Sequence, residues 1–386
     1  MKRNYLVLTA LCGSLSCQAS DYIFQPSFSA TERYDDNFRL QARPSGSNFI
    51  STISPAIKFG YLQETGDLNA NFKLNQLFYS NEPRLEATEK LFDSQYSFAG
   101  ERYNFSLAGN YSIQSSINTE LEPTGSGILL NVNAFRTNRS ISPSFSYRLT
   151  EKNSLQLSYS YSDSAFDNTV RNANIRGFKS QALSSSLSHQ FSPRQSVSLS
   201  ASYSLFDSAS NQNSTSISVQ AGWQYSLNEK TQLGLSVGRR STDTESFGGR
   251  FRSTSNGQIF SANISRTTEW GNLSFNAGQQ LNPATTGQQQ QSTTFSASAS
   301  YNINERLSSS ISANYLQNQA AGGSTSSSRT LTSFSPNLNW RWTEEIRLGL
   351  SYNYRQQAFQ SQNTDAVGNS VQLQFSYQPQ TNRQVK

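Results

Sequence analysis

The feature that most constrains this chain is a strict two-residue alternation of apolar and polar side chains. It is clearest in three segments, which read LQLSYSYS at 155–162, SVSLSASYSL at 196–205 and SISVQAGWQY at 216–225. Successive side chains of a β-strand point to opposite faces, so this period predicts strands with one apolar and one polar face. We find no segment with the period of an amphipathic helix, and we expect an all-β protein.

Short turns and longer polar connections alternate along the chain. The expected short turns lie at Glu64–Asp67, Gly100–Arg102, Thr150–Asn153, Ser192–Gln195, Asn228–Lys230, Glu269–Asn272, Asn304–Arg306 and Thr343–Glu345. The longer connections include Asp35–Ser47, Thr119–Asn133, Asp167–Arg176, Asn282–Gln290 and Gln319–Ser328. Short periplasmic turns and long extracellular loops are the asymmetry of an outer-membrane barrel.

The turns also predict the number of strands. Hairpins at every short turn, with one more strand at each end, make about 18 strands, within a range of roughly 16 to 18. An even number closes an antiparallel barrel with both termini in the periplasm. We therefore expect a transmembrane up-and-down β-barrel over residues 20–378, with no plug or soluble domain, and a polar periplasmic C-terminal tail at 379–386.

Composition excludes several other classes of protein. The chain is only 34% apolar and 15% charged, yet it holds 24 Phe, 18 Tyr and 4 Trp, which a disordered chain would lack. It has no apolar run long enough for a transmembrane helix. A soluble β-sandwich also alternates, but its outer face would then be a large Ser-rich surface with little charge to keep it soluble. The net charge of +6 is too small to indicate nucleic-acid binding.

The N-terminus reads as a secretory signal peptide over residues 1–19. Lys2 and Arg3 precede an apolar stretch and then small residues up to Ala19. Cys12 and Cys17 lack the aliphatic residue three positions earlier that a lipoprotein signal requires, so we expect both to leave with the signal peptide. The mature chain would then contain no disulfide and no thiolate metal site.

Aromatic residues mark two levels along the strands. Near the short turns lie all four tryptophans, Trp223, Trp270, Trp340 and Trp342. Toward the long loops lie Tyr159, Tyr203, Tyr315, Tyr352 and Tyr354. Two aromatic girdles with aliphatic residues between them are typical of the lipid-facing band of a transmembrane barrel, although core aromatic residues of a soluble β-protein would also follow this pattern.

The opposite parity would line the lumen with Ser, Asn, Gln and Gly. Where the last strands meet the first, the same parity predicts an inward basic stripe with few acidic residues, made of Arg33, Lys58, Lys73, Arg341, Arg347 and Arg355. Cations on the wall of a channel concentrate anions. The alternative is that one or two of these residues lie in turns or loops, where they are solvated and have no role. A register error of one residue would also move all the side chains of a strand to the opposite face.

Few residues are suited to catalysis or metal binding. The lone histidine, His189, has outward parity beside Phe191, and an interfacial histidine is the simpler interpretation. Asp35, Asp36 and Asn37 lack the spacing of a calcium loop, so we expect a solvated loop there. We predict that the chain is not an enzyme and that it binds no cofactor or metal.

Two stretches near the N-terminus resemble a known group of proteins. They are PSFSATERYDDNFRL at Pro26–Leu40 and STISPAIKFGYLQETGDLNANFKL at Ser51–Leu74. With their Tyr34–Asn37 and Ile53–Pro55 elements, they resemble the outer-membrane barrels associated with exosortase (PEP-CTERM) systems and the putative β-barrel porin 2 family. The resemblance implies a barrel encoded with polysaccharide synthesis and export machinery, and it brings no catalytic residues.

The sequence is compatible with two functions, both in the outer membrane of a Gram-negative bacterium. One is a porin-like conduit associated with exopolysaccharide export and surface polymer assembly, open to polysaccharide or small anionic solutes. The other is a structural or interaction barrel that anchors a surface polymer or partner with its lumen closed. Expected partners are outer-membrane lipid, lipopolysaccharide and periplasmic export proteins. An inward-folded loop would favour the closed barrel, and a continuous lumen the conduit.

Overall fold

A computed structural model describes residues 21–121, 125, 127, 134–167, 175–246, 248–321, 328–359, 364–380 and 382–385. The expected signal peptide, most of the loop at 119–133, and parts of the loops at 167–176 and 319–328 lie outside these residues.

The described residues form one antiparallel sheet whose strands alternate in direction along the chain. Its first strands are β1 (Asp21–Asp35), β2 (Asn48–Leu62), β3 (Gly66–Tyr79), β4 (Ala87–Ala99), β5 (Tyr103–Ser115) and β6 (Phe135–Arg148). They are followed by β7 (Asn153–Phe166), β8 (Phe178–Ser192), β9 (Gln195–Ser208), β10 (Gln212–Asn228), β11 (Thr231–Ser246) and β12 (Phe251–Thr267). The last are β13 (Gly271–Pro283), β14 (Gln289–Asn302), β15 (Leu307–Ala320), β16 (Arg329–Arg341), β17 (Ile346–Phe359), β18 (Thr364–Tyr377) and β19 (Asn382–Val385).

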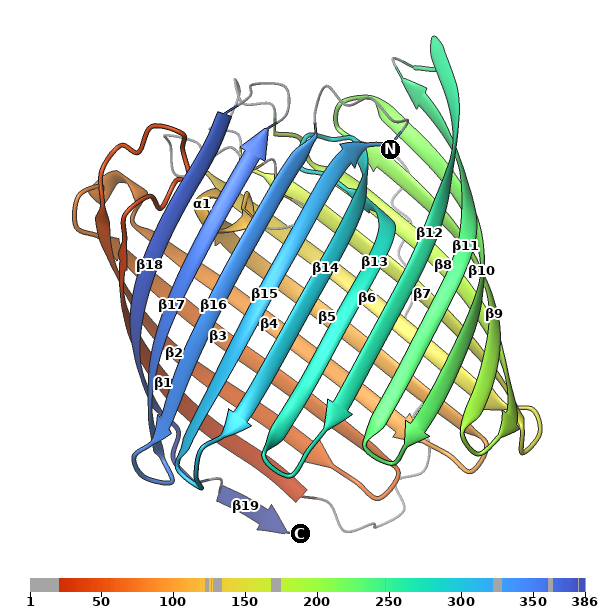
Figure 1. Cartoon of the computed structure of the whole chain (residues 1–386), viewed down its shortest axis with the longest axis horizontal. Helices are drawn as coiled ribbons and strands as arrows, with labels where there is room; N and C mark the ends of the chain where they lie inside the picture. Colours follow the sequence, from red (N-terminus) through yellow and green to blue (C-terminus); the bar gives the residue numbers. More distant parts are fainter. Residues whose placement is uncertain are drawn as a thin grey trace, which may run out of the picture.

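The sheet closes on itself as a barrel of tilted strands (Figure 1). Each strand from β1 to β18 pairs with its neighbours in sequence, and β18 pairs back with β1 from Phe28↔Tyr377 to Asp35↔Ser370. Closure removes the two exposed edges of an open sheet. The expected antiparallel up-and-down barrel with 18 long strands is therefore confirmed.

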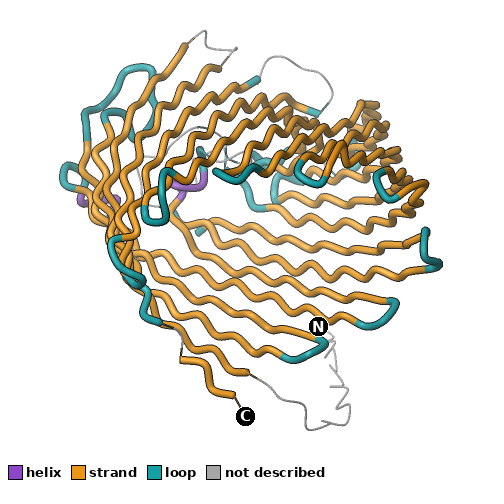
Figure 2. The backbone as a smooth tube through the Cα atoms, turned by 60° about the horizontal axis from the view of Figure 1, so that its bottom comes forward, coloured by secondary structure: helices purple, strands orange, loops and turns teal. Residues whose placement is uncertain are grey.

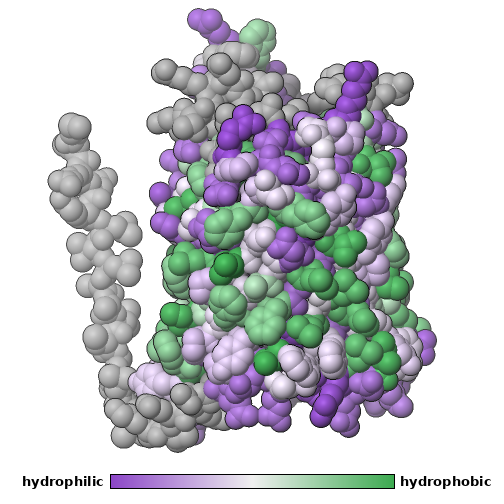
Figure 3. Space-filling model, turned by 90° about the vertical axis from the view of Figure 1, so that its left-hand side faces the viewer, coloured by the Kyte–Doolittle hydropathy of each residue, from purple (hydrophilic) through white to green (hydrophobic). Residues whose placement is uncertain are grey.

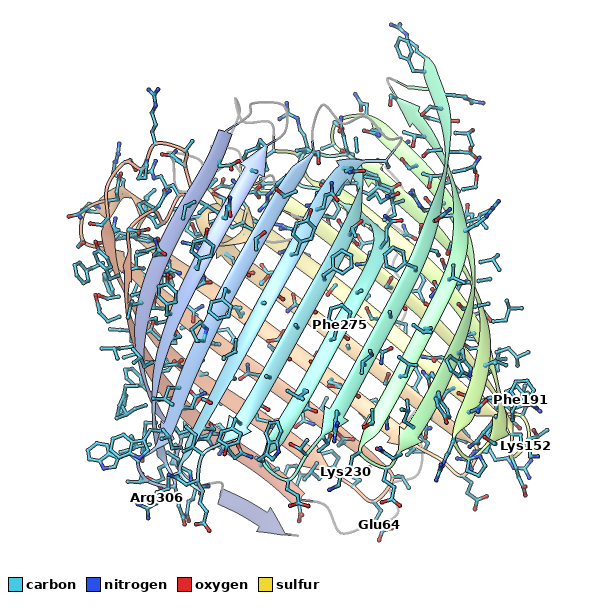
Figure 4. All side chains as sticks on the ribbon, in the orientation of Figure 1. Glu64, Lys152, Phe191, Lys230, Phe275 and Arg306 are labelled. Carbon is cyan, nitrogen blue, oxygen red and sulfur yellow. The ribbon has the colours of Figure 1, made fainter. Side chains whose placement is uncertain are left out.

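All eight expected short turns gather at one end of the barrel, which we call the short-turn end; the other end we call the long-loop end. Figure 4 shows Glu64, Lys152, Lys230 and Arg306 in turns at the short-turn end. The connection expected at Asn282–Gln290 is shorter than predicted, because β13 continues to Pro283 and β14 begins at Gln289.

The two faces of the wall differ as the alternation predicts. Leu157, Val219 and Leu350 are 41%, 50% and 45% exposed on the outer face. Their neighbours Ser158, Ser218 and Ser351 point inward. Figure 3 shows apolar side chains concentrated over the middle of the outer wall, with polar residues toward both ends. A closed barrel with such a band is the architecture of a transmembrane β-barrel.

Three short elements complete the described fold. The 3-10 helix η1 (Pro83–Leu85) lies between β3 and β4, and α1 (Ser116–Thr119) follows β5. In the segment expected to be a polar tail, β19 pairs with the start of β1 from Asp21↔Val385 to Phe24↔Asn382. None of the helices in the described residues is long and apolar enough to cross a membrane.

Candidate functional site in the barrel lumen

The inner wall of the central strands is lined by hydroxyl and amide groups. Serine pairs on adjacent strands hydrogen-bond across it, at 2.7 Å between Ser202 and Ser218 and 2.6 Å between Ser274 and Ser298. Such groups favour contact with water over a packed core. A barrel of 16 to 18 strands encloses an aqueous channel.

The six residues of the expected basic stripe all face the lumen but occupy three levels. Arg33 and Arg355 lie at the long-loop end, where both approach Asp35. Lys58 and Lys73 lie on β2 and β3, and Lys58 shares a hollow of about 330 Å³ with Asp93 of β4. Acidic residues therefore accompany the upper and middle parts of the stripe.

Arg341 and Arg347 form the remaining level, at the short-turn end. They are cross-strand partners at the junction of β16 and β17, and both are exposed. An Arg341 guanidinium nitrogen donates to the Glu305 carbonyl at 2.7 Å. Neither makes an ion pair within the described residues, so their charges stay available to solutes.

Asp35 is not in a solvated loop, and that expectation was wrong. Its side chain is fully buried, with one carboxylate oxygen 2.7 Å from an Arg355 guanidinium nitrogen and 3.9 Å from Nε of Arg33. The other oxygen accepts the Asn37 backbone N–H at 3.1 Å. A buried carboxylate requires such partners.

Asp36 and Asn37 continue these contacts across the barrel seam. The Asp36 carboxylate accepts both the backbone N–H and the side-chain amide of Asn369, at 2.7 and 2.8 Å. The Asn37 amide donates to the Val367 carbonyl at 2.8 Å. The Tyr34–Asn37 element thus joins β1 to β17 and β18. No group of three or more His, Cys, Asp or Glu in the described part could hold a metal.

The segment after β5 folds into the lumen instead of extending outward. Ser116, Thr119 and Glu120 are all 0% exposed, and α1 appears inside the barrel in Figure 2. Glu120 accepts the Thr285 hydroxyl at 2.9 Å, although Thr285 belongs to the connection between β13 and β14 on the far wall. We call the described residues 116–121, 125 and 127 of this connection the crossing segment.

Arg329 of β16 and Gln357 of β17 hold the crossing segment on the far side. The Arg329 guanidinium donates to the carbonyls of Gly125 and Leu121 at 3.0 and 3.1 Å, and to the Gln357 side chain at 3.0 Å. The Gln357 amide donates to the Gly127 carbonyl at 2.8 Å. Gly127 has φ of +73°, and an added Cβ would lie 2.5 Å from Nε of Arg329, so both backbone conformation and space favour glycine.

The end of the β13–β14 hairpin also leans inward. Pairing between β12 and β13 stops at Phe260↔Gln279, and beyond it Gln291 of β14 accepts a hydrogen bond from Arg240 of β11 at 2.9 Å. The Thr285 carbonyl accepts the Arg176 backbone N–H at 2.6 Å. Together with the crossing segment, this hairpin narrows the long-loop end.

An apolar cluster also occupies the long-loop end, where parity alone predicts a wet wall. It consists of Phe38, Ile50, Leu77, Tyr79, Leu85, Ala87 and Ile117. Ile50, Leu77 and Tyr79 break the polar inward pattern of β2 and β3, and this break was the available sequence signal. They pack against η1 and α1 and so hold the inward-folded connections in place.

The tryptophans expected to form a girdle lie on or beside the outer wall near the short turns. Trp270, Trp340 and Trp342 are 43%, 45% and 54% exposed. Trp223 is partly exposed and stacks on Tyr225 with ring centroids 5.5 Å apart. Nearby, His189 hydrogen-bonds Asn153 at 2.8 Å and packs nearly perpendicular to the Phe191 ring, with ring centroids 4.7 Å apart, as a structural interfacial residue would.

Comparisons with known proteins give distant likenesses only. No family model and no curated protein matches the chain. Acinetobacter baumannii OccAB3 is similar in structure, with 10% identity over 94% of this chain and 99% of that chain and a TM-score of 0.47. Pseudomonas aeruginosa OpdK with vanillate has 9% identity over 92% and 98%, with a TM-score of 0.46. Pseudomonas aeruginosa OprD has 8% identity over 92% and 95%, with a TM-score of 0.44. The barrel architecture follows from the strand pairing of this chain.

Proposed function

We propose that this protein is a porin-like conduit in the outer membrane of a Gram-negative bacterium. The observation that carries the proposal is the closed barrel with an apolar outer band and an inner wall of serine, asparagine and glutamine. Barrels of this kind span outer membranes, and their polar interiors conduct water-soluble molecules. The short turns then face the periplasm.

The charges of the inner wall favour anionic solutes. Lys58, Arg341 and Arg347 face the lumen and are exposed, whereas Arg33 and Arg355 approach Asp35. The electric field of these cations is screened over about 8 Å at physiological salt, so in a wide pore it produces only a modest preference for anions over cations. We expect weak anion selectivity that disappears at high salt.

A connection to exopolysaccharide export is the finer part of the proposal. Its support is the resemblance carried by Tyr34–Asn37 and Ile53–Pro55, two elements that lie on adjacent paired strands at the barrel seam. An acidic polysaccharide would match the expected selectivity. Periplasmic export proteins would contact the short-turn end.

A structural barrel with a closed lumen is the second candidate, favoured by the crossing segment. Arg329, Gln357 and Thr285 bond this segment from the far wall. Inward-folded loops plug some barrels and leave them without a conducting path. The long-loop end would then serve to anchor a surface polymer or partner.

Conductance in planar bilayers separates the two candidates. The conduit predicts single-channel steps and a reversal potential of weak anion selectivity under a salt gradient. Arg341→Gln with Arg347→Gln should reduce this selectivity, while Arg239→Gln, on the outer wall, should leave it unchanged. A cation-selective wild type would contradict the anionic solute. A silent wild type would favour the closed barrel.

A further inference from the structure

The inner wall at the short-turn end contains a hollow of about 540 Å³ formed by β5 to β10 and their turns. We call it the rim hollow. Its volume lies within the roughly 300–1,000 Å³ of small-molecule sites. Four cations line it, Arg102, Arg148, Lys152 and Arg194, together with two acids, Glu101 and Glu151. The ionised side chains leave an excess of positive charge.

The four cations of the rim hollow are free to bind a ligand. All are exposed, and none makes an ion pair within the described residues. Inward arginines at the long-loop end are used differently: Arg329 holds backbone carbonyls, Arg240 bonds Thr242 and Gln291, and Arg136 bonds Ser164. Anion binding at the rim hollow therefore disrupts no ion pair of the described residues.

The wall around Arg148 provides space and hydrogen-bonding groups. Across the strands on the β7 side, Arg148 is in register with Ser154, and the row continues through Ser188 and Ser198 to Gly222, so small side chains stand on that side of the guanidinium. Exposed amides also line the hollow, among them Gln156, Gln190 and Gln224.

These groups match an acidic sugar better than a simple ion. A guanidinium binds a carboxylate through two parallel hydrogen bonds. Each amide both donates and accepts, and this suits sugar hydroxyls, which do the same. We propose that the rim hollow binds the carboxylate-bearing sugar units of an anionic oligosaccharide. The proposal rests on the proposed conduit, whose solute class it makes more specific.

Calorimetric titration of the full-length barrel in detergent tests this site without requiring conduction. The probes are trigalacturonate and, as a neutral control of equal length, maltotriose. We expect trigalacturonate to bind and maltotriose to bind at least tenfold more weakly. Arg148→Gln with Arg194→Gln should weaken trigalacturonate binding at least tenfold. The matched control, Lys179→Gln with Arg239→Gln, removes the same charge from the outer wall and should leave the affinity unchanged.

Several outcomes would overturn the site. They are an absence of trigalacturonate binding, equal binding of maltotriose, an unaffected double variant, or an equal loss in the control variant. Binding of triglutamate as tight as that of trigalacturonate would show a general anion site and overturn sugar recognition. This titration measures no current, so it tests the binding site independently of conduction. If the barrel binds trigalacturonate but shows no conductance in bilayers, the proposed site stands and only the proposed conduit is contradicted.

Discussion

At the scale of single residues, burial decides what a lumenal arginine does. Arg355 is 14% exposed and contacts a fully buried carboxylate, so it stabilises the seam. Arg347, on the same strand and the same face, is exposed and has no ion-pair partner in the described part of the chain. Only the second kind of arginine can attract solutes, because the charge of the first is already compensated.

The Asp35 to Arg355 contact predicts a clear difference in stability. Removing one partner of a buried pair leaves an uncompensated charge and costs roughly 3–5 kcal/mol. Because Arg355 keeps some exposure, we expect Arg355→Ala to lower the free energy of unfolding by about 3 kcal/mol, measured by urea titration in lipid vesicles. Arg347→Ala should change it by less than about 0.5 kcal/mol. Equal losses would mean that the pair does not stabilise the seam.

The two faces of the wall predict opposite tolerance to charge. Leu157→Arg places a cation in the apolar band and should cost about 2–4 kcal/mol of unfolding free energy. Ser158→Arg places it in the lumen, where water solvates it, and should cost much less. The same urea titration compares the two, and equal costs would contradict the assignment of the faces.

At the scale of elements, the inward-folded connections determine the width of the lumen. The crossing segment begins at α1, packs on the apolar cluster, and is bonded from β16 and β17 on the far wall. The β13–β14 hairpin meets it through Thr285. The narrowing of the lumen at the long-loop end therefore depends on a few polar contacts between elements that are distant in sequence.

Arg329 makes two of the hydrogen bonds that hold the crossing segment in the lumen. Arg329→Ala removes its bonds to the Leu121 and Gly125 carbonyls and to Gln357. We expect the segment to be released and the single-channel conductance in planar bilayers to rise. Arg239→Ala, on the outer wall, is the control and should conduct like the wild type. An unchanged conductance in Arg329→Ala would show that solutes pass elsewhere.

At the scale of the whole molecule, closure and turn asymmetry define two different ends. The eight short turns lie together, and β19 pairs beside the first strand near them (Figure 1). The inward-folded connections and the apolar cluster lie at the other end. The proposed orientation places the long-loop end, which the inward-folded connections narrow, at the outer surface of the cell. It places the rim hollow at the periplasmic end of the lumen.

Labelling of whole cells tests this orientation. Because the expected mature chain has no cysteine, single cysteines report cleanly. A membrane-impermeant thiol reagent should label Ser45→Cys, in the exposed connection between β1 and β2, and should not label Glu305→Cys, in a short turn. Lysed cells should label both. If whole cells label Glu305→Cys and not Ser45→Cys, the orientation of the barrel is the opposite of the proposed one.

The sequence by itself determined the strands, the short turns and the face of each side chain. These properties depend on local geometry: a period of two and a turn every few tens of residues need no knowledge of distant partners. The parity placed Leu157 outward and Arg347 inward without any contact being known. It also led to the strand number, because an up-and-down barrel pairs each strand with the next.

Only the tertiary structure decided which lumenal residues are free. Asp35 meets Arg355, which is 320 positions away in the sequence, and Glu120 meets Thr285, which is 165 positions away, so no local pattern reveals either contact. The apolar cluster formed for the same reason: inward Ile50 and Tyr79 become a core only because η1 and α1 fold over them. Burial depends on what closure brings opposite a residue, and alternation records only which way that residue points.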